Sequence, residues 1–152
     1  MRKNKKTNIQ KAKSALIVSL GAIIGLSFIG LLAQTTQSMM IIAPFGATAV
    51  LLFALPHSPS STPLSVVSSY AIASAVGLVF LFYGAGDWLY IGIGFGITLF
   101  LLQIFEVVHP PAGAHYIVVT QGTLTLHALA PLIVGLSILV IIAIFFKRAL
   151  SD

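Results

Sequence analysis

The stretch "EVVHPPAGAHYIVV", from Glu106 to Val119, interrupts an otherwise apolar chain with prolines, a glycine and ionisable side chains. Of the 152 residues, 58% are hydrophobic and only 7% are charged. Between Ser14 and Phe146 the sole formal charges are those of Asp87 and Glu106. This composition excludes a soluble domain and predicts an all-α, polytopic membrane protein whose main partner is the lipid bilayer.

Four apolar runs have about the 20 residues that a helix needs to cross a hydrocarbon core about 30 Å thick. They are Ala15–Ala33, Leu64–Phe82, Leu89–Val108 and Pro131–Phe146, the last of which lengthens if residues 126–130 join it. We therefore predict a basic tail over residues 1–14 and a transmembrane domain over residues 15–148.

Basic residues gather at both ends of this predicted domain. The net charge is +5, and six of the eight basic residues lie in "MRKNKKTNIQKAK", just before the first run, while Lys147 and Arg148 follow the last. We interpret them as a topology signal and expect no nucleic-acid partner. Because positive charge favours the cytoplasmic side, both termini are predicted to lie in the cytoplasm, with an even number of crossings of the cell membrane.

Two further apolar segments are each broken near their start. In "APFGATAVLLFAL" and "HPPAGAHYIVV" a proline falls where the first turn of a helix tolerates it best, so short helices are predicted to begin at Pro44 and Pro111. The first, ending at Leu55, would be about 18 Å long, too short to span a bilayer alone. We favour four crossings with two re-entrant helices; the alternatives are six crossings as a 3+3 inverted repeat, or a structural helix kinked by proline.

The two broken segments superimpose when the chain is aligned with itself so that Pro44 falls on Pro111. The same alignment, which we call the repeat alignment, places Gly46 on Gly113 and Ala47 on Ala114. Each half then contains a span, a short broken segment and a second span. The repeat alignment favours an internal duplication over residues 15–82 and 83–148.

A helix that starts inside a membrane leaves its first N–H groups unpaired, so its start must face protein or a wet cavity. Two converging starts, each with about half a positive charge, suit a small anion or a polar neutral solute. The candidate substrate-binding residues therefore surround these starts and the loop between them: Pro44, Phe45, Gly46, Ala47, His57, Ser58, His109, Pro110, Pro111, Gly113, Ala114 and His115.

Glu106 precedes His109 by three residues, so a helical turn would bring the carboxylate and the imidazole onto one face. Buried charge is costly in a membrane, which makes Glu106 a candidate for proton exchange, although plain exposure at the interface is an equal alternative. One Glu and one His do not make a metal site. We predict no metal and no cofactor, and the absence of a nucleophile motif or phosphate loop favours a protein that is not an enzyme.

The motifs "HPPAGA" and "PFGATAVLLFALPHSP" resemble the HPP family of integral membrane proteins over about Ala43 to Phe146. The resemblance implies a compact bundle usually described as four transmembrane helices, and a link of some photosynthetic members to nitrite transport. The chain departs from the family pattern at Leu64 and Ser65, where relatives commonly carry arginine and asparagine, and at Tyr70, near the place of a histidine. The missing arginine argues against a site that binds an anion strongly.

These observations together predict a small, homo-oligomeric transport protein for a nitrite-like inorganic anion or another polar solute. The solute would pass the paired helix starts near Pro44 and Pro111. A structural or accessory membrane subunit without its own pathway is the alternative.

Overall fold

The structure is a computed structural model that describes residues 7–35, 37, 42–83, 87–122 and 126–151. Residues 1–6 of the predicted basic tail lie outside these residues. All the regular elements of the described residues are helices and none is a strand, which confirms the all-α prediction. Its elements are α1 (Asn8–Thr35), α2 (Ile42–Ala49), the π-helix η2 (Val50–Ala54), the 3₁₀ turn η3 (Pro59–Ser61), α3 (Pro63–Phe82), α4 (Trp88–Ile104), α5 (Pro111–Thr120) and α6 (Leu126–Ser151).

Three of the described helices are long and apolar enough to cross a membrane: Asn8–Thr35, Pro63–Phe82 and Pro131–Arg148, the last within α6. Helix α4 has 17 residues and ends at Ile104, before the predicted end of its run at Val108. Helix α5 begins at Pro111 as predicted, whereas α2 begins at Ile42, shortly before Pro44.

The end of α4 is fixed by a left-handed residue. Glu106 has a φ of 55°. The N–H of Glu106 donates to the carbonyl of Gln103 at 3.1 Å, and the N–H of Val107 donates to that of Leu102 at 3.0 Å. These are the two hydrogen bonds of a Schellman motif, in which glycine is the usual left-handed residue. The motif turns the chain out of the helix and toward the His-Pro-Pro sequence.

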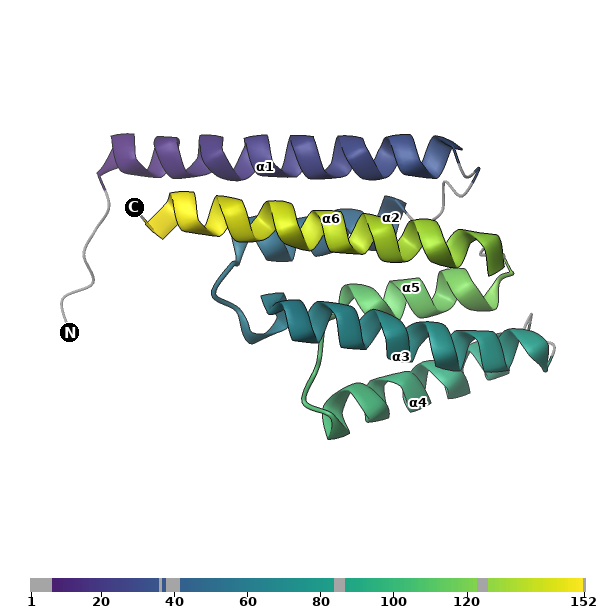
Figure 1. Cartoon of the computed structure of the whole chain (residues 1–152). Helices are drawn as coiled ribbons and strands as arrows, with labels where there is room; N and C mark the ends of the chain where they lie inside the picture. Colours follow the sequence, from purple (N-terminus) through teal and green to yellow (C-terminus); the bar gives the residue numbers. More distant parts are fainter. Residues whose placement is uncertain (1–6, 36, 38–41, 84–86, 123–125, 152) are drawn as a thin grey trace.

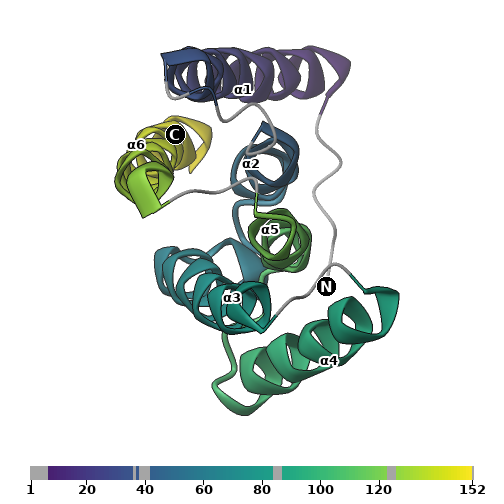
Figure 2. The same ribbon diagram turned by 90° about the vertical axis from the view of Figure 1, so that its right-hand side faces the viewer.

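Consecutive α-helices run in opposite directions (Figure 1). The short helices α2 and α5 lie at the centre, with α1 and α6 on one side and α3 and α4 on the other (Figure 2). The first turns of α2 and α5 overlap, and each helix then continues toward an opposite end of the bundle (Figure 1). A re-entrant segment would return to the end from which it came. In the structure the chain instead leaves α2 at the end of the bundle opposite to the one at which it entered, and the same holds for α5 (Figure 1).

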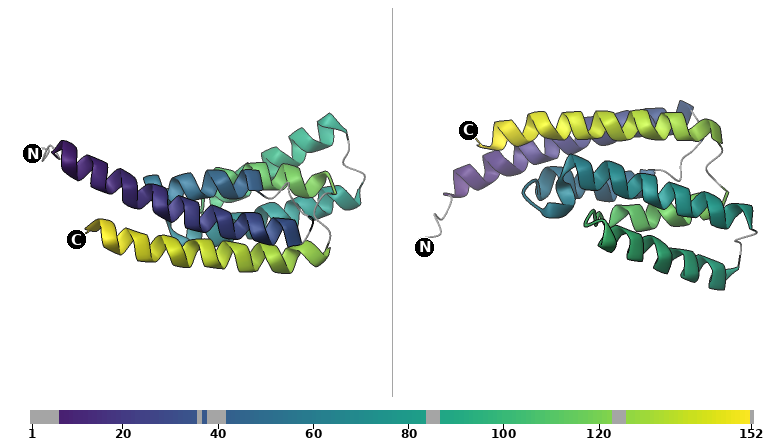
Figure 3. Two further views of the ribbon diagram at one scale, coloured as in Figure 1. Left: turned by 90° about the horizontal axis from the view of Figure 1, so that it is seen from above. Right: turned by 60° about the horizontal axis from the view of Figure 1, so that its bottom comes forward.

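The packing of the helices is preserved when the two halves are exchanged. Helix α1 packs on α6 and on α2, while α4 packs on α3 and on α5. In the same way, α6 contacts η2, which continues α2, and α3 contacts α5. Figure 3 shows the two long pairs flanking the short helices.

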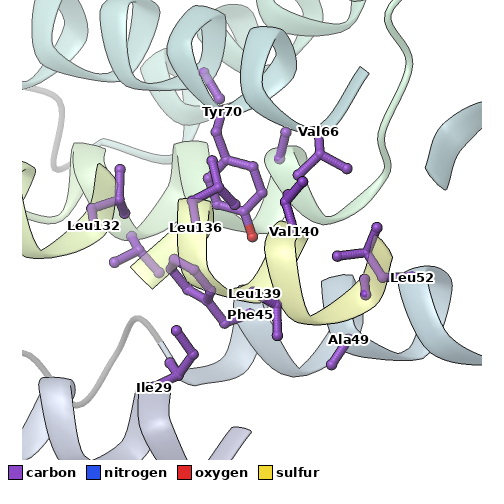
Figure 4. Packing of buried hydrophobic residues seen from close by; sticks show 14 of the residues in the cluster. Ile29, Phe45, Ala49, Leu52, Val66, Tyr70, Leu132, Leu136, Leu139 and Val140 are labelled. Carbon is purple, nitrogen blue, oxygen red and sulfur yellow. The ribbon is translucent and has the colours of Figure 1, made fainter. Parts of the chain in front are cut away.

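The core lies between α2, α3 and α6. Phe45, Tyr70 and Leu139 meet there and are at most 1% exposed (Figure 4). Helix α1 approaches this core through Gly21 and Gly25, where an added Cβ would lie within 3.0 Å of Phe53 or Leu139 atoms. By contrast, an added Cβ at Gly92 or Gly96 would meet nothing within 4 Å. The outer faces carry large apolar side chains, as hydrocarbon surroundings require.

Candidate functional site

A cluster of buried polar side chains lies where α2 and α5 meet. Thr48 of α2, His109 just before α5 and His115 of α5 are fully buried, and Tyr70 of α3 is 1% exposed. Each comes from a different part of the sequence. We call these four residues, together with Ser74 of α3, the central cluster.

Three of these side chains form a continuous line of hydrogen bonds that ends on a backbone carbonyl. Nδ1 of His109 lies 2.6 Å from the carbonyl oxygen of Ser60, and Nε2 lies 2.9 Å from Oγ1 of Thr48. The same Oγ1 lies 2.9 Å from the hydroxyl of Tyr70. Because a carbonyl can only accept, Nδ1 of His109 carries a hydrogen and donates it to Ser60.

The second histidine of the cluster is only partly satisfied. Nε2 of His115 lies 2.8 Å from Oγ of Ser74. Nδ1 is buried and has no hydrogen-bond partner among the residues that the structure describes. The imidazole also packs against the ring of Tyr70, with centroids 4.8 Å apart and planes 37° apart. Tyr70 therefore belongs to the line of hydrogen bonds and also packs against His115.

Helical spacing explains how the cluster forms. Tyr70 and Ser74 are four residues apart and lie on one face of α3, the face that also buries Val66, Ala73 and Gly77. The repeat alignment pairs Thr48 with His115, so the two broken helices carry a polar side chain at the same position. Because the two helices are antiparallel and overlap near their starts, both polar side chains face the centre.

The structure places only two of the predicted site residues in this cluster, namely His109 and His115. Four others are buried around it: Pro44, Phe45, Pro111 and Gly113. Gly46 and Ser58 are half-buried, and Ala47, His57, Pro110 and Ala114 are exposed. Ser58 instead accepts a hydrogen bond from the N–H of Ser60 in the 3₁₀ turn.

The start of α5 differs from the prediction of unpaired N–H groups. The N–H of Ala112 donates to the carbonyl of His109 and the N–H of Gly113 to that of Pro110, both at 3.0 Å. Pro111 has no N–H to offer. The His-Pro-Pro sequence thus satisfies the helix start within one turn, and side chains supply the free polar groups of the site.

The predicted pairing of Glu106 with His109 is wrong. The left-handed turn at Glu106 ends the helix, so the two residues do not share a helical face. Glu106 is exposed, whereas His109 points into the protein toward Thr48 and Ser60. Within the described residues, no group of three or more His, Asp or Glu side chains is placed to hold a metal ion.

Two cavities flank the central cluster. One, of about 190 Å³, lies between α4 and α5 and is lined by apolar side chains together with Thr98 and Gly113. The other, of about 240 Å³, lies between η2 and α6, and its lining includes Ser61, Val140 and Lys147. Ser61 follows Ser60, so this second cavity reaches the turn on which the line of hydrogen bonds ends.

A family model described as HPP, transmembrane region, matches residues 7–152. The chain belongs to the HPP transmembrane family. A protein of Dictyostelium discoideum described as a transmembrane protein is 26% identical over 94 residues, which are 59% of this chain and 33% of the relative. The chain thus spans about a third of that relative's length. No solved structure matches the chain.

In this HPP protein, the motif after which the family is named performs a defined structural task. His109 ties the loop to Ser60 and Thr48, while the carbonyls of His109 and Pro110 cap the start of α5. The motif therefore joins three elements that are distant in sequence.

Sequence reasoning missed Thr48, Tyr70 and Ser74. Each is a polar side chain in a strongly apolar helix. The available signal was the repeat alignment, which places Thr48 opposite His115. A polar side chain recurring at one position of two broken helices indicates that both face the same interior space.

Proposed function

We propose that this HPP protein transports a small inorganic anion such as nitrite, or a similarly small polar solute, without chemical conversion, and that the central cluster is its binding site. The observation that carries the proposal is Nδ1 of His115, which is buried and has no partner. Leaving a buried polar atom unpaired costs about 1–3 kcal/mol. Retention of such an atom where two broken helices meet supports a site for a solute or water.

Six crossings are part of the proposal. Helix α5 contributes 10 residues, or about 15 Å, and the non-helical residues 106–110 add up to about 16 Å at about 3.3 Å each. The sum approaches the hydrocarbon thickness of about 30 Å. Non-helical chain is tolerated at membrane depth when protein covers it. Val107 is 7% exposed and His109 is fully buried, which supports such cover.

The orientation follows from charge and from the path of the chain. The start of α1 and the end of α6 lie at the same end of the bundle (Figure 1). Lys11 and Lys13 lie near the start of α1, and Lys147 and Arg148 near the end of α6, so these basic residues gather at this end. We propose that the protein lies in the plasma membrane. By the positive-inside rule, both termini and the loop that holds His57 then lie on the cytoplasmic side.

The donors for an anion would come from side chains and from two helix dipoles. The central cluster contains hydroxyl and imidazole groups and no arginine or lysine. The positive ends of α2 and α5 face the same region, and each helix end carries about half a unit charge. Such a site favours a small monovalent anion over a multiply charged one.

A structural or accessory subunit is the second candidate. It is favoured by the two cavities, because their linings are mostly apolar and neither includes His115 or Tyr70. The homo-oligomeric state predicted from the sequence stays a prediction for either function.

Uptake by proteoliposomes that contain only this protein tests the proposal. Nitrite should enter at neutral pH, where it is ionised, faster than into protein-free vesicles. His115→Leu should abolish uptake because it removes both ring nitrogens, whereas the matched control His57→Leu, in an exposed loop, should not. A folded wild-type preparation that moves no small anion would favour the accessory role. Full uptake by folded His115→Leu would move the site elsewhere.

A further inference from the structure

We infer that the line of hydrogen bonds from Ser60 through His109 and Thr48 to Tyr70 couples the binding of one anion at the Tyr70 hydroxyl to the uptake of one proton at His109. This inference rests on the proposed function and names its coupling ion. It depends on the direction in which each hydroxyl donates, and the four groups fix that direction.

With a neutral imidazole, every donor in the line points one way. Nδ1 of His109 donates to Ser60, so Nε2 has a lone pair and accepts from the Thr48 hydroxyl. Oγ1 of Thr48 then accepts from the Tyr70 hydroxyl. The hydrogen of Tyr70 is used within the protein, and the site offers an anion no hydroxyl donor.

A proton on His109 reverses the line. A new N–H bond forms at Nε2 with a proton delivered by hydronium, which leaves as water. Nε2 now donates to Oγ1 of Thr48, which frees the hydroxyl hydrogen of Thr48 to rotate toward Tyr70 and to donate to its oxygen. No other covalent bond changes. The hydrogen of Tyr70 is released from Thr48 and needs a new acceptor.

An anion fits this need better than a neutral solute. The ring of Tyr70 extends from α3 into an apolar core beside Phe45, where an unused O–H is costly (Figure 4). A buried imidazolium also needs a compensating negative charge. One small anion that accepts from Tyr70 meets both requirements, because its charge balances the proton on His109.

Few other ionisable groups surround His109 in the described chain. Helix α3 contributes Tyr70, whose ring centroid is 5.9 Å from that of His109, and α5 contributes His115 behind it. Helix α2 and the 3₁₀ turn contribute Thr48 and the carbonyl of Ser60, which do not ionise. Glu106, on the same loop as His109, is exposed. His109 is therefore the group whose protonation changes the direction of the hydrogen bonds in the line.

Protons can approach from the end of the bundle that holds the termini. The cavity of about 240 Å³ runs from Lys147 to Ser61, next to the residue whose carbonyl binds His109.

Calorimetric binding of nitrate to the purified full chain tests the inference, because nitrate stays ionised across the pH range used. Affinity should rise by about tenfold per pH unit of acidification while free His109 is neutral, with one proton taken up per anion. Histidine ¹⁵N spectra should show His109 protonated at Nδ1 alone without nitrate and at both nitrogens with it.

Three variants distinguish this coupling of proton and anion, which we call the relay, from a structural role of the line. Thr48→Val interrupts the line and should remove the pH dependence, and Tyr70→Phe removes the donor and should abolish binding at every pH. The control Ser69→Ala removes a hydroxyl of α3 that donates to the carbonyl of Val66 and lies outside the central cluster, so it should keep the full slope. If Thr48→Val does not fold, the histidine spectra of the wild-type protein and the nitrate binding of Tyr70→Phe still test the relay.

Nitrate binding that is independent of pH, or that takes up no proton, would overturn the relay and leave anion transport standing if uptake persists. Binding that keeps its slope in folded Thr48→Val would also overturn it. A wild-type protein that takes up solute but binds no anion would show that the solute is neutral, which refutes the relay alone.

Discussion

Gly77→Ala should destabilise the protein, because α3 and α5 touch at this glycine. A Cβ added to Gly77 would lie 2.8 Å from both Cβ and Cγ1 of Val119 and 3.4 Å from the carbonyl oxygen of Tyr116. Val119 is fully buried, and its β-branched side chain is stiff at χ1, so it cannot turn away. Overpacking of this kind costs about 1–3 kcal/mol.

Gly92→Ala is the matched control on α4, since its added Cβ would meet nothing within 4 Å. That variant should gain about 0.5–1 kcal/mol because alanine is the better helix former. Gly77→Ala shares this gain in helix formation, so the two variants should differ by the overpacking cost alone, about 1–3 kcal/mol in unfolding free energy. At about 2–4 °C per kcal/mol for a domain of this size, the difference in Tm amounts to several degrees.

Thermal unfolding in detergent, followed by circular dichroism, measures this difference. Equal melting temperatures for Gly77→Ala and Gly92→Ala would refute the reasoning, because they would mean that α3 does not approach α5 as closely as the structure shows.

Two further predictions concern the loops. Glu106→Gly should stabilise the protein by about 1 kcal/mol, because glycine adopts the left-handed conformation without strain. Glu106→Ala should bring no such gain. Equal melting temperatures for the two variants would argue against the Schellman turn. If six segments cross the membrane, His57→Cys should be labelled by an impermeant reagent only from the cytoplasmic side and Asp87→Cys only from outside; the reverse result would restore four crossings.

Much of the fold could be predicted from the sequence because single residues or short runs determine where its helices start and end. Proline at 111 fixes the start of α5, and apolar runs fix the long helices to within a few residues. The end of α4 was missed because a glutamate, and not glycine, holds the left-handed position. The path of the chain through α2 and α5 was harder to predict, since length alone cannot tell a short helix that turns back from one that an extended segment completes.

The site was less predictable because its contacts join residues far apart in the chain. His109 meets Thr48 across 61 residues, and His115 meets Ser74 across 41. Local spacing suggested the nearer pairing of His109 with Glu106, which a single left-handed residue prevents. Long-range polar contacts follow from how helices pack, and apolar sequences specify that packing only through small details such as Gly77 against Val119.

The placement of both chain ends has a practical consequence. The start of α1 and the end of α6 lie at one end of the bundle, with α1 packed on α6 (Figure 1). Two copies can therefore be fused head to tail through a short flexible linker that never has to cross the bilayer. A single gene for such a tandem pair would carry different substitutions in its two copies, so that the number of intact subunits needed for activity can be counted directly.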